Sequence, residues 1–353
     1  MEIRKFGKDK NGEDISLITL KNKNGLIAEV TDMGASLVNM IVPDKNGEPV
    51  DVVLGYPSGE DYENNMNCYG ATIGRNGNRI GNATFTLNGE TYKLWHPEKS
   101  PHNLHSAPDV FYRRKWNFET EKGDDAESVC FFLNSPEGDQ GFPGSLDMEV
   151  TYTLTEENEL MIDYYGLSDK DTVFNMTNHS YFNLNGDASG DILGHRVKLF
   201  ADAYNETDCD LIPTGVLSDV TGTPMDFREE KTIGQDIGAD FEPLHFGHGY
   251  DHNFIINGGL VQEDAELVGW CTGDKTGIKM EIYTDLPGVQ MYTANGMEQP
   301  NGKHGKAYHT NGAVCFETQY FPDSVNHPEF PQPIIRAGEE KVSLTVYRFT
   351  TEK

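Results

Sequence analysis

Basic side chains are scarce in this chain. It carries 28 lysines and arginines against 57 aspartates and glutamates, which gives a formal net charge of -29 at pH 7. A protein this acidic repels nucleic-acid backbones, anionic membranes and polyanionic substrates. We therefore expect the ligand to be a neutral small molecule.

Paired cysteines and long apolar runs are also missing. The 5 cysteines are scattered along the chain and form no C-x-x-C pair, a pattern typical of free thiols in a reducing cytoplasm. No apolar run is long enough to span a bilayer, and the first seven residues lack the apolar part of a signal peptide. These absences predict a soluble, cytoplasmic protein.

Helical periodicity is rare, whereas strand periodicity is frequent. The best helical windows, residues 58–65 and 234–241, are short and contain glycine, so we expect single turns there. Residues 148–154 instead alternate between apolar and polar side chains, and a second apolar stretch at 160–167 follows. This pattern predicts a β-hairpin with a four-residue loop at 156–159.

Asn-Gly pairs, the strongest short-range signal for a hairpin turn, recur along the chain. Several of them lie between apolar or alternating runs, and the pairs are Asn11-Gly12, Asn24-Gly25, Asn46-Gly47, Asn88-Gly89 and Asn257-Gly258. No internal repeat or linker composition interrupts the chain. The sequence therefore predicts one all-β domain over residues 1–353, a large antiparallel β-sandwich.

A glutamate and a histidine interrupt two of the apolar segments. Glu317 lies within residues 313–321, among valine, cysteine and phenylalanine, and His179 lies within residues 173–182. A carboxylate in such a run must shift its pKa, form an ion pair or face a pocket. Glu317 is thus either a chemical base or half of a structural ion pair, and His179 is either a proton donor or a satisfied core side chain.

Other polar segments offer binding groups with equally open interpretations. Residues 70–81 are rich in glycine and contain two arginines, but no helix follows, so a dinucleotide site is a poor match. Asn78 and Arg79 either form a donor cluster at a pocket edge or belong to a structural loop with an ion-paired arginine. His105 either binds a ligand oxygen or is a solvated loop residue, and Gln290 either binds a hydroxyl group or satisfies a neighbouring group.

Three histidines and an aspartate crowd into residues 245–252. Such a cluster raises the hypothesis of a metal site, but none of the familiar zinc spacings is present. The glycine-rich path through this segment indicates a loop. The residue pattern therefore favours a site without a metal.

Together, these segments resemble the aldose 1-epimerase family, the galactose mutarotases. The similar pieces, in the order of the family, are residues 74–80, 103–105, 177–184, 250–254, 287–293 and 317–319 with Pro322, Asp323 and Asn326. The resemblance extends from residue 51 to residue 339. It implies a galactose mutarotase-like supersandwich fold with an open sugar-binding cleft, and neither a metal nor an organic cofactor.

The resemblance also implies an activity and a set of site residues. The activity is the interconversion of α and β anomers of free hexoses such as galactose and glucose, by a monomer or homodimer that binds a monosaccharide. Glu317 would be the general base and His179 the general acid. The implied sugar-binding residues are Asn78, Arg79, His105, Asp251 and Gln290.

Two further expectations concern the environment of these residues. Partial burial should raise the pKa of Glu317, and nearby carboxylates should keep His179 protonated for longer, so that both pKa values approach neutrality. The loop after His105 lacks the Gly-Gly pair usual in the family, which changes the permitted backbone dihedrals and the bulk of the cleft wall. The preferred sugar is therefore left open.

Three other functions compete with this interpretation. A glycoside hydrolase would use Glu317 and Asp251 as its acid pair, but it leaves His179 without a role. A hexose-6-phosphate epimerase conflicts with the acidic composition unless the basic cluster at residues 113–115 faces the cleft. A non-catalytic sugar-binding or sensing protein would need neither of the two proton carriers.

Overall fold

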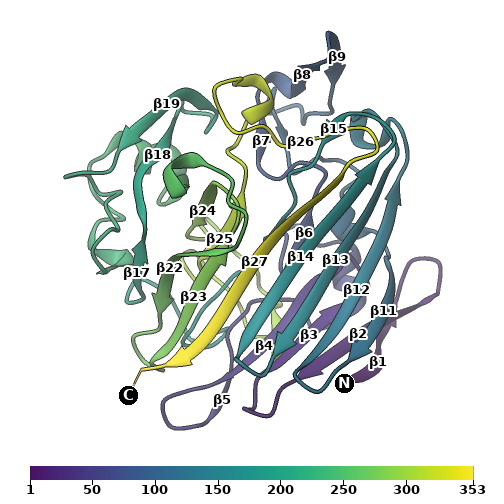
Figure 1. Cartoon of the computed structure of the whole chain (residues 1–353). Helices are drawn as coiled ribbons and strands as arrows, with labels where there is room; N and C mark the ends of the chain where they lie inside the picture. Colours follow the sequence, from purple (N-terminus) through teal and green to yellow (C-terminus); the bar gives the residue numbers. More distant parts are fainter. Residues whose placement is uncertain (353) are drawn as a thin grey trace.

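The computed structural model describes residues 1–352, which form mainly β-strands in three large sheets (Figure 1). The largest sheet contains, in spatial order, β11 (Asn117–Lys122), β12 (Ala126–Ser135), β13 (Leu146–Thr155), β14 (Glu159–Ser168), β27 (Glu340–Thr351), β23 (Ile278–Thr284), β22 (Glu266–Thr272), β17 (Arg196–Leu199) and β20 (Lys231–Thr232). Its strand pairings are antiparallel throughout. Within the described residues, no helix has the length and apolar character needed to cross a membrane.

Two five-stranded sheets accompany the largest one. The first contains β1 (Glu2–Lys8), β2 (Asp14–Lys21), β3 (Ile27–Thr31), β4 (Ser36–Pro43) and β5 (Pro49–Asp51). The second contains β19 (Pro213–Asp219), β18 (Ala201–Thr207), β21 (Asp251–Ile256), β24 (Gly288–Tyr292) and β25 (Cys315–Gln319). Val30 of β3, Val150 of β13 and Val289 of β24 belong to one buried apolar cluster, so a single core connects the three sheets. The predicted all-β sandwich is confirmed.

Short paired strands and two helices complete the fold. The two-stranded units are β6 (Ala71–Ile73) with β16 (Thr177–His179), β7 (Arg79–Ile80) with β10 (Asn103–Leu104), β8 (Thr84–Leu87) with β9 (Glu90–Lys93), and β15 (Thr172–Val173) with β26 (Ile334–Ile335). The helices are α1 (Gly59–Glu63) and α2 (Glu242–Gly247). The first two of these strand pairs carry candidate site residues.

The alternating segment at 148–154 forms the predicted hairpin. Met148, Val150, Tyr152 and Leu154 of β13 are buried, and β13 pairs with β14 in the register Leu154↔Leu160. Because β14 already begins at Glu159, three residues rather than four separate the two strands. The period of two therefore identified both the strands and their buried face.

Four of the five Asn-Gly pairs lie in hairpin turns. Those at residues 11–12, 24–25, 46–47 and 88–89 each connect two strands that pair with one another. The interpretation of Asn257-Gly258 as a hairpin turn is wrong. There the chain makes a short 3₁₀ turn after β21 and then continues to β22, which belongs to a different sheet.

Helical structure is limited, as expected. The window at 58–65 contains the short helix α1, and the window at 234–241 overlaps a 3₁₀ turn at Ile233–Gln235. The segment around His245, expected to be a loop, is partly helical because α2 begins just before it. A proline and Glu242 in the first turn of α2 are both favourable at a helix N-terminus.

Arg75 is a fully buried arginine that holds several loops together. Its guanidinium donates to the backbone carbonyls of Ser135, Pro136 and Pro143 and to the hydroxyl groups of Ser135 and Thr172. Burial lowers the pKa of Arg75 to about 10. Arg75 is therefore a structural arginine, which is one of the two roles that the sequence left open for this glycine-rich segment. Its guanidinium binds neutral carbonyl and hydroxyl oxygens, however, and not the carboxylate of an ion pair.

Replacement of Arg75 by lysine should destabilise the fold strongly. The ammonium group has three donors instead of five and cannot reproduce the planar fork, so several buried acceptors lose their partners. We expect Arg75→Lys to lower the free energy of unfolding by about 3 kcal/mol, measured by urea denaturation. Arg4→Lys, at an exposed ion pair with Glu29, should change it by less than about 0.5 kcal/mol, and equal losses would contradict the assignment.

Candidate active site

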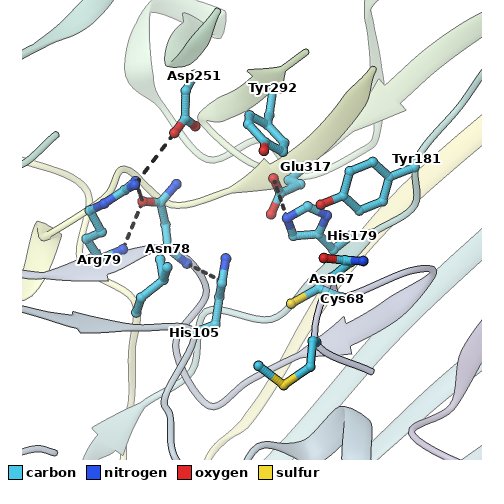
Figure 2. A pocket seen from close by; sticks show the side chains of 12 residues that line it. Asn67, Cys68, Asn78, Arg79, His105, His179, Tyr181, Asp251, Tyr292 and Glu317 are labelled. Atoms are coloured by element: carbon cyan, nitrogen blue, oxygen red, sulfur yellow. Dashed lines mark hydrogen bonds and ion pairs between the residues drawn. The ribbon is translucent and has the colours of Figure 1, made fainter. Parts of the chain in front are cut away.

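One pocket gathers most of the predicted site residues. It has a volume of about 270 Å³, which suits a single small ligand (Figure 2). Its lining residues are Met66, Asn67, Cys68, Asn78, Arg79, Leu104, His105, His179, Tyr181, Asp251, Tyr292 and Glu317. Six of the seven predicted site residues are therefore together in one pocket, and Gln290 is the exception.

Glu317 lies in the middle of β25 and is only 2% exposed. Its Oε1 atom is 3.6 Å from Nε2 of His179, and its Oε2 atom has no hydrogen-bond partner in the described chain. Burial raises the pKa of Glu317 well above its ordinary value, and the negative charge of Asp251 adds to this shift. Glu317 is therefore harder to ionise than an exposed glutamate.

His179 is the last residue of β16, a strand that lies beside β25. Its ring stacks on Tyr181 at a centroid distance of 4.9 Å, and its Nδ1 atom is 3.5 Å from Sγ of Cys315. Backbone hydrogen bonds in both directions between Phe182 and Val314 connect the segments that carry His179 and Glu317. These contacts hold two side chains that are far apart in sequence in one fixed arrangement.

The expectation that His179 stays protonated for longer is wrong for the ligand-free site. Burial lowers the pKa of His179 to about 4. The physical reason is that burial of the ring opposes its charged form more strongly than the negative charge of Asp251 favours it. Because the pKa of Glu317 is raised and that of His179 is lowered, the pair holds one titrating proton between these two pKa values, and that proton is on Glu317.

His105 presents a hydrogen-bond donor to the pocket. Its Nδ1 atom accepts the backbone N–H of Asn78 at 3.1 Å, and burial keeps the ring neutral by lowering its pKa well below the ordinary value. A neutral ring that accepts at Nδ1 carries its hydrogen on Nε2. His105 can therefore donate this N–H to a ligand oxygen.

The tautomer of His105 also bears on metal binding. Potential ligand atoms of His105, His179 and Glu317 lie within 4.8 Å of one another. A metal ion needs the lone pair of a ring nitrogen, but the bond to Asn78 occupies the Nδ1 lone pair and leaves N–H on Nε2. The donor set therefore suits a ligand that has hydroxyl or ether oxygens better than it suits a metal ion.

Asn78 and Arg79 reach the pocket through the short β7–β10 pair. Leu104 pairs with Arg79, which places His105 beside Asn78. Arg79 Nη2 is 3.5 Å from Oδ2 of Asp251, and Figure 2 shows this ion pair on the side of the pocket opposite Tyr181. An arginine paired with a carboxylate offers both donors and acceptors to a polyhydroxylated ligand.

Gln290 contacts Asp251 and does not line the pocket. It is 3% exposed, and its Nε2 atom donates to Oδ1 of Asp251 at 2.6 Å. Two interpretations were open for Gln290: binding a ligand hydroxyl group or satisfying a neighbouring group. The structure shows the second, because the amide contacts Asp251. Asp251, at the start of β21, is held by Arg79 on one oxygen and by Gln290 on the other.

The loop after His105 keeps a left-handed backbone without glycine. Ser106 has φ of 58°, and its Oγ atom both accepts from the backbone N–H and donates to the carbonyl of Asn76. These two hydrogen bonds compensate for a backbone conformation that otherwise favours glycine. Ser106 therefore adopts the left-handed region that glycine usually occupies.

The basic cluster at residues 113–115 lies outside the pocket lining described above. Arg114 pairs with Asp139 at 2.7 Å, and Lys115 pairs with Glu13 at 3.3 Å. Arg113 donates to the backbone carbonyl of Asn65. Arg113 also donates to Sδ of Met66, which lines the pocket, but none of the three cations is itself a lining residue. The cluster therefore offers no support for a phosphorylated sugar as substrate.

The histidines of residues 245–252 do not converge on one point. His245 pairs with Asp240, whereas His252 is buried and accepts the backbone N–H of Asp251 at its Nδ1 atom. His248 ends helix α2 with φ of 55°. The metal hypothesis for this segment therefore has no structural support.

Several lining residues were not identified from the sequence. Tyr292 is two positions beyond Gln290 in β24, so the period of two could have placed both on one face. Tyr181 follows His179 by two residues. Met66, Asn67 and Cys68 enter from a loop, and no local pattern in the sequence indicated them.

The fold is a β-sandwich, and its pocket places a buried carboxyl group 3.6 Å from an imidazole among side chains that can donate to and accept from hydroxyl groups. This combination is typical of a sugar-converting enzyme of the acid–base type. Residues 16–348 match the family model described as Aldose 1-epimerase. The chain belongs to the aldose 1-epimerase family, and it is an isomerase. The resemblance stated from the sequence is thereby confirmed.

Named relatives support this assignment over nearly the whole chain. The chain is 36% identical over 347 residues to the Aldose 1-epimerase of Escherichia coli K12, covering 97% of each protein. It is 36% identical over 326 residues to the Galactose mutarotase of Homo sapiens, covering 92% of this chain and 91% of that protein.

Solved structures agree with the fold. The GalM/aldose epimerase homologue from C. elegans has a TM-score of 0.85 at 30% identity, covering 96% of this chain and 99% of that chain. A galactose 1-epimerase from Lactobacillus acidophilus NCFM also has a TM-score of 0.85, at 24% identity, covering 100% of this chain and 99% of that chain. The second comparison bears on the fold alone.

The protonation state of His179 can be measured directly. In the ligand-free protein, its imidazole should stay neutral from pH 7 down to about pH 4, because burial opposes the charged form. Ring nitrogen chemical shifts, assigned by the signal lost in His179→Gln, would show this. Glu317→Gln should leave the pKa of His179 nearly unchanged because Glu317 is already neutral; a marked fall would contradict that.

Proposed function

We propose that this protein interconverts the α and β anomers of free hexoses such as galactose and glucose. The observation that carries the proposal is the 3.6 Å separation between Glu317 Oε1 and His179 Nε2 within one pocket. In a cyclic hexose the C1 hydroxyl oxygen and the ring oxygen are both bonded to C1. Two proton-transfer groups this close together can address both oxygens of one hemiacetal.

Ring opening requires two proton transfers. The Glu317 carboxylate removes the proton from the C1 hydroxyl, and the His179 imidazolium donates its Nε2 proton to the ring oxygen. The bond between C1 and the ring oxygen breaks, its electron pair stays with that oxygen, and C1 becomes an aldehyde carbon. Rotation about the C1–C2 bond presents the other face, and the reverse transfers close the ring as the other anomer.

Burial favours both transfers in the opening direction. A higher pKa makes Glu317 a stronger base, and a lower pKa makes His179 a stronger acid. The reactive state, with Glu317 ionised and His179 protonated, is reached by transfer of the titrating proton from Glu317 to His179, at a cost that the same pKa difference sets. After ring opening both groups are neutral, which is the state that a dry environment stabilises.

The remaining polar groups are proposed to orient the sugar. Arg79, Asp251 and Asn78 surround one side of the pocket, and His105 donates from another. Hydrogen bonds from these groups would hold the sugar so that the two proton carriers meet the correct oxygens. Gln290 would contribute through Asp251, to which it donates.

Location and assembly are part of the proposal. The cysteines are all free thiols, which supports the cytoplasmic location inferred from the sequence. The buried cluster shared by the three large sheets supports a single domain over residues 1–353. We propose that this domain functions as a monomer or a homodimer.

Glu317→Gln tests the proposed base directly. The amide keeps the size of the side chain but cannot take a proton, so kcat should fall by about 10²- to 10⁴-fold. Polarimetry or NMR exchange on fresh α-D-galactose and α-D-glucose measures this loss. Glu157→Gln, at an exposed position, is the matched control and should retain the wild-type rate. If the wild type binds galactose without accelerating its mutarotation, the protein is a sugar-binding protein instead.

The pH profile of kcat/KM should reflect the one-proton pair. As the pH falls through about 4, His179 gains a proton while Glu317 is already protonated, so the base is lost. As the pH rises through the elevated pKa of Glu317, the pair loses its titrating proton, so His179 can no longer become an imidazolium and the acid is lost. We expect an acid limb near pH 4 after subtraction of the uncatalysed rate; a limb near pH 6.5 would contradict the assignment.

A further inference from the structure

A row of buried amide side chains crosses four neighbouring strands and ends at Asp251. Asn205 lies on β18, Asn253 on β21, Gln290 on β24 and Gln319 on β25. Each is at most 3% exposed, and none of the four is among the residues that line the pocket in the described chain. Four buried amides in contact require mutual hydrogen bonds, because an unsatisfied buried polar group is costly.

The hydrogen bonds in this row are continuous. Asn253 Nδ2 donates to Asn205 Oδ1 at 2.7 Å, and Gln319 Nε2 donates to Asn253 Oδ1 at 3.1 Å. Gln319 Nε2 also contacts Gln290 Oε1 at 3.4 Å, and Gln290 Nε2 donates to Asp251 Oδ1 at 2.6 Å. The two hydrogens of the Gln319 amide thus connect the Asn253 side of the row to Gln290.

The carboxylate of Asp251 determines the orientation of every amide in the row. A carboxylate only accepts, so Gln290 must direct its NH₂ group at Asp251 and its oxygen at Gln319. Gln319 must then donate to that oxygen, and its second hydrogen meets the oxygen of Asn253. Reversal of any one amide would bring two acceptors or two donors together in a dry environment.

Gly288 makes this row possible. It pairs with Gln319 in the β24–β25 register and is two positions before Gln290 on the same face. A Cβ atom at Gly288 would lie 2.7 Å from the Asn253 amide. The missing side chain therefore leaves the gap through which Gln319 and Asn253 meet.

We propose that Gln319 is a positioning residue for sugar binding, supported by Asn253. It orients Gln290, and Gln290 in turn holds Oδ1 of Asp251 while Arg79 holds Oδ2. Asp251 therefore meets a sugar hydroxyl in one fixed orientation. This inference rests on the proposed function, in which Asp251 binds the substrate and Glu317 and His179 carry out the proton transfers.

Gln319→Met tests the proposal at the central position of the row. Methionine has a similar size but cannot donate, so Gln290 loses the partner of its oxygen and becomes free to turn away from Asp251. We expect KM for galactose to rise about tenfold, which is the effect of about 1.4 kcal/mol of lost binding. The value of kcat should stay within about threefold of wild type, because Glu317 and His179 are unchanged.

Asn205→Leu is the matched control at the far end of the row. It removes a buried amide and one hydrogen bond, as expected of a structural residue, but it does not contact Gln290 or Asp251. Urea unfolding of both variants shows whether they are destabilised alike. At similar stability, KM should rise in Gln319→Met and stay within about twofold of wild type in Asn205→Leu.

Two results would overturn the proposal: an unchanged KM in Gln319→Met, or an equal rise in KM in both variants, which indicates a structural role only.

If Gln319→Met does not fold, Asn253→Leu replaces it. This change removes the acceptor of the second Gln319 hydrogen and leaves the strand of Glu317 unaltered in sequence, and the same criteria apply. A wild-type protein that does not accelerate mutarotation contradicts the proposed function itself, whereas an active wild type with an insensitive Gln319 contradicts only this inference.

Discussion

The exclusion of water from a carboxyl group and an imidazole that face each other is the constraint on which the site depends. Glu317 and His179 lie 3.6 Å apart, and both are nearly fully buried. A buried charge without a partner is costly, so each group adopts its neutral form. The same cost makes one group a strong base and the other a strong acid. In the proposed mechanism, reactivity toward a hemiacetal arises from this burial.

The sandwich supplies the rigid support that this pair needs. Glu317 comes from β25 and His179 from β16, and reciprocal backbone hydrogen bonds between Phe182 and Val314 connect the two segments. Tyr181 stacks on the imidazole and lines the same pocket, so it helps to hold the ring in place. Proton transfer needs donor and acceptor positions accurate to a fraction of an ångström, and strands in a packed sheet provide this accuracy better than loops do.

Much of the site could be predicted from residue types and local patterns. The polar interruptions at Glu317 and His179 were identified because ionisable groups in apolar strands are costly, whereas Asp251 entered the prediction only through the resemblance to the family. Six of the seven predicted residues line one pocket. The two arginines of residues 70–81 could not be distinguished in this way. Arg75 is structural and Arg79 faces the pocket, although both have the same local composition. Which of them is buried among carbonyl groups depends on loops more than 50 residues away.

The sequence by itself determined the strand periodicity, most of the hairpin turns and the supply of proton-transfer groups, because these depend on neighbouring residues. Only the tertiary structure decided the direction of the His179 pKa shift, the placement of Gln290 behind Asp251 and the row of amides beyond it. The reason is physical. A pKa depends on how much water and charge surround a group, and a chain of buried hydrogen bonds depends on which strands become neighbours; both are set by contacts between residues far apart in the chain.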